Sequence, residues 1–168
     1  MSPLDGGNLN RAFIDDPERG STWAIAHYID TVLFPMCTPF HDYHAGGSSL
    51  HCLPFASARL SGDPELDRRS LDALKAFAPT PPWTRFVQVK DCGYYVFAPD
   101  SGVFEPVVKL GDHVEAGRPA GYVRSLEDPG RPAAPCRFNV SGMAVGRRAM
   151  GRREPGDCLF HLATDTEG

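Results

Sequence analysis

The chain has 168 residues, of which 42% are hydrophobic and 23% are charged. This balance is typical of a globular protein with a buried core, and it excludes wholesale disorder. The formal net charge of −4 gives no electrostatic reason to expect binding to nucleic acid or to an anionic membrane.

Membrane and export signals are missing from the sequence. No stretch is long and apolar enough to span a bilayer, and the N-terminus lacks the basic-then-apolar pattern of a secretory signal. The five cysteines are scattered and include no C-x-x-C pair, which argues against a zinc ribbon or a thioredoxin-like site. We interpret them as reduced thiols and expect a cytoplasmic protein.

The first predicted element is a helix. Ser21 or Thr22 can cap it, and apolar residues recur at helical spacing from Ile25 as far as Leu33. Pro35 is expected to end it, because proline removes a backbone donor and clashes with the preceding turn.

Two short strands and a second helix are predicted next. Residues 40–43 form an expected strand that ends at His44, and residues 51–59 form another. Asp63 and Pro64 are a typical cap and first-turn pair for a helix with apolar residues on one side. This first part therefore predicts a mixed α/β arrangement.

A proline-rich run divides the chain into two unlike parts. Three prolines between Ala78 and Trp83 discourage both helix and central strand, so this run is a natural linker. We therefore expect an α/β domain at 1–78, a linker at 79–83 and a β domain at 84–168.

Short β segments separated by Gly, Pro and Asp fill the second part. The predicted strands are residues 85–89, 94–98, 103–109, 120–124, 137–140, 143–147 and 158–163. An internal repeat at an offset of forty residues aligns the Ser-Gly pair at Gly102 with that at Gly142. Two such hairpin units can close on each other as a small barrel without exposed edges.

The repeat resembles a biotinyl/lipoyl-type barrel-sandwich fold. A carrier of that type displays a lysine at the tip of the hairpin between the two copies. Residues 125–132, which form that connection here, contain no lysine. Carrier function is therefore not expected. The arginines near the C-terminus (Arg147, Arg148, Arg152 and Arg153) are interpreted as a solvated hairpin face.

Two short motifs could carry chemistry. Asn10-Arg11 offers an amide and a planar guanidinium, which matches a carboxylate with two parallel hydrogen bonds. About thirty residues later, His44 follows Asp42 and precedes two glycines, and an imidazole in such a place suits a metal ion. Asp42 could orient that imidazole by accepting a hydrogen bond from the ring nitrogen that does not bind the metal. Together the motifs indicate a zinc hydrolase acting on a substrate with a carboxylate.

In this order, the motifs resemble those of the succinylglutamate desuccinylase/aspartoacylase family, zinc-dependent deacylases related to metallocarboxypeptidases. The segment from Tyr95 to Pro106 is also similar to the opening of that family's C-terminal β domain. The resemblance implies a partial zinc-carboxypeptidase-like α/β/α domain followed by a small all-β barrel-sandwich domain.

The resemblance also implies site roles and a reaction. His44 matches the family's third zinc ligand, and Asn10 and Arg11 match its substrate-binding pair. The reaction would be hydrolysis of the amide bond of a small N-acyl amino acid, with zinc polarising the carbonyl and activating water.

The sequence departs from the family pattern at the remaining catalytic groups. The His-x-x-Glu motif that supplies the first two zinc ligands is not found, and the segment with the catalytic glutamate is expected to be deleted. We therefore expect a chain that is inactive or incomplete by itself, and whether it is an enzyme stays open. Alternatives are a non-catalytic binding or assembly protein and one chain of a split hydrolase.

Nearby residues do not convincingly replace the missing zinc ligands or the catalytic glutamate. His41 and His44 have a chelating spacing but point to opposite faces if they lie on a strand. A nucleophilic pair of His51 and Cys52 has no oxyanion motif beside it. A shortened sheet would expose an apolar face, so a homo-oligomer (a homodimer) or a hetero-complex formed through the N-terminal half is expected.

Overall fold

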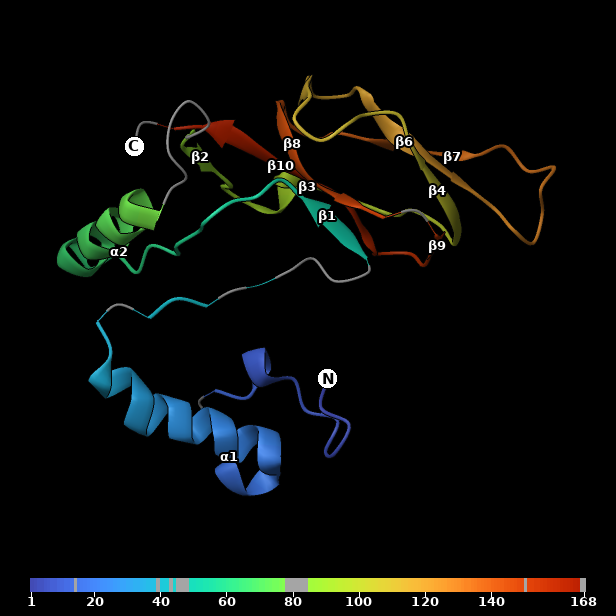
Figure 1. Ribbon diagram of the computed structural model, residues 1–168. Helices are drawn as coiled ribbons and strands as arrows, with labels where there is room; N and C mark the ends of the chain where they lie inside the picture. The colour runs from blue at the N-terminus through green and yellow to red at the C-terminus, as the bar shows by residue number, and fades with distance from the viewer. Residues whose placement is uncertain are drawn as a thin grey trace. The chain divides into compact units, whose positions relative to one another are not determined.

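The computed structural model describes residues 1–13, 15–38, 40–42, 44, 49–77, 85–149 and 151–166 (Figure 1). The chain forms two compact units, Met1–Tyr43 and His44–Gly168. The linker expected at 79–83 lies outside the described residues. The division falls earlier because β1 (Leu50–Cys52) pairs with β8 (Gly142–Arg148), which joins this strand to the C-terminal sheet.

The first unit is helical in its described residues. Short 3-10 turns at Leu9–Arg11 and Pro17–Arg19 precede α1 (Ser21–Tyr28). The helix continues as a π turn at Ile29–Leu33 and a 3-10 turn at Phe34–Met36. Pro35 lies in this last turn and Cys37 is extended, so the helix ends one residue beyond the proline. The strand predicted at 40–43 is wrong for residues 40–42, which carry no strand.

The N-terminus of α1 is capped from a distance. Gly20 occupies the cap position, so the prediction that Ser21 or Thr22 provides the cap is wrong. Instead, the carboxylate of Asp5 accepts hydrogen bonds from the backbone N–H and the hydroxyl of Thr22, both at 2.7 Å. These bonds, from the backbone N–H above all, lower the pKa of Asp5. Asp5 thereby fastens the N-terminal turn to the helix.

The second helix confirms its predicted cap. In α2 (Pro64–Phe77), the side-chain oxygen of Asp63 accepts from the backbone N–H groups of Glu65 at 2.9 Å and Leu66 at 3.1 Å. The strand predicted at 51–59 is confirmed only at its start, where β1 ends at Cys52.

Two antiparallel sheets make up the rest of the second unit. The six-stranded sheet contains β1, β2 (Val87–Gln88), β3 (Tyr95–Phe97), β5 (His113–Val114), β8 and β10 (Cys158–Asp165). The four-stranded sheet has the order β7 (Ala134–Arg137), β6 (Pro119–Arg124), β4 (Gly102–Pro106), β9 (Arg152–Arg153). The strand expected at 137–140 is shifted toward the N-terminus, and it includes Pro135, which an edge strand tolerates.

The internal repeat explains this arrangement. Strands β3 to β6 recur about forty residues later as β7 to β10, and Gly102 and Gly142 begin the equivalent strands β4 and β8. A Cβ at Gly102 would lie 2.0 Å from the carbonyl oxygen of Arg124, and one at Gly142 would lie 2.7 Å from the carbonyl oxygen of Ala163. The close approach of the neighbouring strand therefore requires glycine in both copies.

The two copies are interlocked. Each contributes a hairpin to its own sheet, β4 with β6 and β8 with β10. Each also lends two strands to the other sheet: β3 and β5 pair with β10 and β8, whereas β7 and β9 pair with β6 and β4. The result is a sandwich of two sheets rather than the closed barrel that the repeat allowed.

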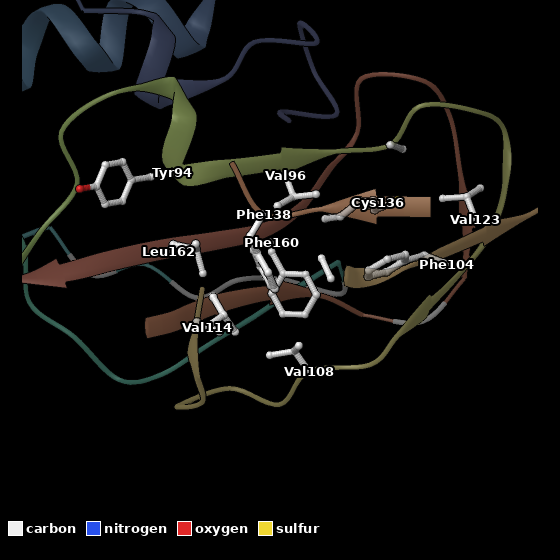
Figure 2. Close-up of a cluster of buried hydrophobic side chains, with 14 residues drawn as sticks. Tyr94, Val96, Phe104, Val108, Val114, Val123, Cys136, Phe138, Phe160 and Leu162 are labelled. Atoms are coloured by element: carbon white, nitrogen blue, oxygen red, sulfur yellow. The ribbon is translucent and has the colours of Figure 1, made fainter. Parts of the chain in front are cut away.

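The core lies between the sheets and is aromatic at its centre (Figure 2). Phe160 from the six-stranded sheet is fully buried and meets Phe104 edge-on at 6.0 Å and Phe138 at 5.4 Å between ring centroids. Phe104 belongs to the four-stranded sheet, so Phe160 joins both layers. This packing places the independent hydrophobic core of the protein in the second unit.

Candidate functional site

The candidate substrate-binding pair lies in the first unit, on the 3-10 turn Leu9–Arg11. The side-chain oxygen of Asn8 caps this turn by accepting from the backbone N–H of Asn10 at 3.1 Å. Both Asn10 and Arg11 are exposed, and the Arg11 guanidinium donates to the Asn10 carbonyl at 2.9 Å. A guanidinium has five N–H donors, so this exposed side chain has donors beyond that bond with which it can bind a carboxylate.

Three phenylalanines hold this turn against other parts of the unit. Phe13 stacks on Phe34 with ring centroids 5.8 Å apart and an interplanar angle of 6°. Phe34 meets Phe40 edge-on at 4.8 Å. The ring of Phe13 therefore packs against the helix end.

The candidate metal ligand His44 is exposed and belongs to the second unit. His41 and Asp42 are exposed residues of the first unit, and neither lies on a strand. The placement of His44 at a strand end is therefore not supported in the described residues. Gly46 and Gly47, which complete the motif, lie outside them.

A complete metal site is not formed by the described residues. Within them, no three His, Cys, Asp or Glu side chains are grouped so that they could hold a metal ion. A catalytic zinc ion takes three protein ligands, so a single histidine such as His44 does not fit it. The residues present therefore do not account for a zinc centre by themselves.

The five cysteines are free thiols. His51 and Cys52 are adjacent on β1 and so point to opposite faces of the sheet. Burial raises the pKa of the Cys52 thiol, which disfavours the nucleophilic thiolate. The structure therefore gives no support to a Cys-His nucleophile at this position.

His161 is a half-buried titratable group that sequence reasoning missed. Its ring stacks on Tyr95 with centroids 4.4 Å apart, and its buried Nε2 atom has no hydrogen-bond partner among the described residues. Burial lowers the pKa of His161 and keeps the ring neutral. The burial of His161 follows from its pairing with Tyr95 across β3 and β10, and that pairing is not visible in the sequence.

The C-terminal arginines are not a uniformly solvated face. Arg153 is only 6% exposed and donates to the backbone carbonyls of Ala149 and Arg152. Arg148 pairs with Asp157 at 3.4 Å. Burial, and then the positive charge of Arg148, lowers the pKa of Arg153. Its contacts give Arg153 a structural role, in which its side chain joins β9 to Ala149, the residue after β8.

Comparison with known proteins supports the fold and gives a partial sequence match. No family model matches the chain. Over 76 residues, 45% of this chain, the sequence is 47% identical to an N-alpha-acetyl-L-2,4-diaminobutyric acid deacetylase of Halomonas elongata. That match covers 22% of the deacetylase, so the similar segment spans less than a quarter of its length.

Solved structures match over nearly the whole chain. A succinylglutamate desuccinylase/aspartoacylase from Rhodobacter sphaeroides has a TM-score of 0.88 at 24% identity, covering 99% of this chain and 70% of that one. The product-bound ectoine utilization protein EutE (DoeB) of Ruegeria pomeroyi has a TM-score of 0.80 at 22% identity, covering 98% and 69%. These likenesses confirm the predicted fold class. None of the described helices has the length and apolar character needed to cross a membrane.

Proposed function

We propose that this chain, which has the fold of the succinylglutamate desuccinylase/aspartoacylase family, belongs to the N-acyl amino acid deacylases. The observation that carries the proposal is the 47% identity to a deacetylase over 76 residues, joined to a fold match over the whole chain. The relatives named above are called deacetylase, desuccinylase and aspartoacylase, and each name denotes removal of an acyl group. The substrate class is therefore a small N-acyl amino acid.

Arg11 binds the carboxylate of the amino acid, and the side-chain amide of Asn10 assists this binding. A guanidinium is planar and always charged, so it can donate two parallel hydrogen bonds to a carboxylate. The exposed position of Arg11 on a capped turn supports this role, because the turn fixes the backbone and leaves the side chain accessible.

His44 is proposed as one ligand of a zinc ion that the described residues do not hold by themselves. The described residues therefore do not complete a catalytic centre, and the other ligands come from polypeptide outside them. The free thiols agree with a location in the reducing cytoplasm.

Arg11→Gln should weaken binding of Nα-acetyl-L-2,4-diaminobutyrate about tenfold or more, since it removes a charge-assisted hydrogen-bond pair. Binding is measured by NMR titration, following the side-chain resonance of Arg11 in the unchanged chain and backbone amides in both. Arg59→Gln, at another exposed arginine, is the matched control and should bind like the unchanged chain. Equal affinities of all three proteins would contradict the role of Arg11.

An assembly role is the second candidate, and the surface of the first helix favours it. Four apolar side chains recur along α1 and the turns that follow, all more than a third exposed: Ile25, Tyr28, Val32 and Met36. From residue 21 to residue 36, Asp30 is the only acidic or basic residue apart from His27. A helix so poor in charge is usually covered on more than one side.

We expect the chain to form a homo-oligomer through this helix face. Light scattering at increasing concentration should show a mass above that of the 18.3 kDa chain. Ile25→Glu should return the protein to a monomer, because it places a charge in the apolar face, whereas Leu126→Glu, on an exposed loop of the second unit, should not. A monomer at every concentration would contradict the assembly role.

A further inference from the structure

The three phenylalanines of the first unit connect three separate segments. Phe13 follows the turn with Arg11, Phe34 begins the last turn of the helix, and Phe40 precedes His41 and Asp42. Phe34 lies between the other two, stacked on Phe13 and edge-on to Phe40. Phe34 is therefore the shared contact of the segment that carries Arg11 and the segment that carries Asp42.

The helix changes its winding just before Phe34. The π turn at Ile29–Leu33 inserts extra backbone relative to an α-helix, and the 3-10 turn at Phe34–Met36 then tightens it. A π turn rotates every side chain that follows, and such turns are frequent at functional sites. Here the rotation leaves Phe34 in contact with both Phe13 and Phe40.

We propose that Phe34 is a positioning residue, which fixes the turn carrying Arg11 relative to the segment carrying His41 and Asp42. The inference rests on the proposed function, in which Arg11 binds the carboxylate of an N-acyl amino acid. Phe34 does not touch the substrate. It acts through Phe13 and Phe40, whose rings it holds.

The contacts indicate why simple burial does not explain this cluster. Phe40 is 54% exposed, so it contributes little as a core residue. Its ring nevertheless meets the ring of Phe34 at 4.8 Å, which is shorter than the Phe13–Phe34 distance and than both core pairs of Phe160 in the described residues. Edge-on and stacked pairs impose a direction as well as an attraction, so they can set the orientation of a loop.

The test compares Phe34→Leu with the unchanged chain, Phe34→Tyr and Phe55→Leu. Leucine keeps an apolar side chain but loses both ring contacts, whereas tyrosine keeps them. Phe55 is an exposed phenylalanine of the second unit and serves as the control. Nα-acetyl-L-2,4-diaminobutyrate is titrated while the Arg11 side-chain resonance is followed, well below the unfolding temperature of each protein.

We expect Phe34→Leu to weaken this binding about tenfold, the loss that corresponds to two aromatic contacts. Phe34→Tyr and Phe55→Leu should stay within about twofold of the unchanged chain. A merely structural role would lower the unfolding temperature of Phe34→Leu without changing the affinity of the folded protein. Such a result would overturn the proposal.

A second measurement separates this inference from the proposed function. Backbone relaxation of His41 and Asp42 should show more motion in Phe34→Leu than in Phe34→Tyr, with or without the ligand. If the unchanged chain does not bind the ligand, the proposed function fails, and greater motion of these residues still supports positioning by Phe34. Unchanged motion in Phe34→Leu would overturn the positioning role whatever the binding result.

Discussion

The purified chain, supplied with zinc, is expected to hydrolyse Nα-acetyl-L-2,4-diaminobutyrate no faster than the buffer does. Enzymes typically accelerate their reactions by about 10⁶-fold or more over the uncatalysed reaction. We expect none of that acceleration from this chain. The reason is that the described residues group no three donors around a metal ion. Release of diaminobutyrate is measured over hours by an amine-reactive assay.

The control for this assay is the His44→Ala variant. Because no catalytic centre is expected, the variant and the unchanged chain should be indistinguishable. Turnover by the unchanged chain that disappears in His44→Ala would contradict the prediction, since it would show that a working centre with His44 assembles within these 168 residues.

Phe160→Ala should lower the free energy of unfolding of the second unit by about 3–5 kcal/mol. The side chain is fully buried and contacts Phe104 and Phe138. Its removal leaves a cavity between the sheets and breaks two aromatic pairs. Urea unfolding followed by circular dichroism measures the change, with the slope of the transition as a check on two-state behaviour.

Phe97→Ala is the matched control for the core prediction. Phe97 belongs to β3, the strand beside β10, but it is 48% exposed, so its truncation should cost much less. Comparable losses for the two variants would mean that Phe160 does not join the sheets as described.

The β part of the fold was predictable because its signals are local. The repeated Ser-Gly pairs mark equivalent strand starts, and Gly102 and Gly142 are required by the close approach of a neighbouring strand. The cap at Asp63 was predictable for the same reason, since the residues it bonds follow within three positions. The cap depends on neighbours in the sequence and the repeat is visible in it, whereas the contacts that require glycine come from Arg124 and Ala163, more than twenty positions away.

The missed features depend on distant residues. The cap of α1 comes from Asp5, seventeen positions before Thr22. Strand β1 pairs with β8 nearly a hundred residues later, which joins β1 to the sheet of the second unit. The pairing of β1 with β8 depends on the tertiary fold, so local pattern could not supply it.

The candidate site was predictable only in part. The accessible position of Arg11 agrees with the role inferred for it, because an exposed guanidinium on a capped turn can reach a carboxylate. The cluster around Phe34 was not visible, since its three rings come from segments up to twenty-seven positions apart. The ligand role of His44 stays a prediction, because Gly46 and Gly47 lie outside the described residues.

The described residues carry the fold of the succinylglutamate desuccinylase/aspartoacylase structures without a complete zinc centre. Zinc content, measured by mass spectrometry after dialysis against a zinc-buffered solution, tests it most directly. We expect well below one zinc ion per chain, with no difference between the unchanged protein and His44→Ala. One zinc ion per chain that is lost in His44→Ala would contradict the account, because it would mean that the chain completes the metal centre by itself.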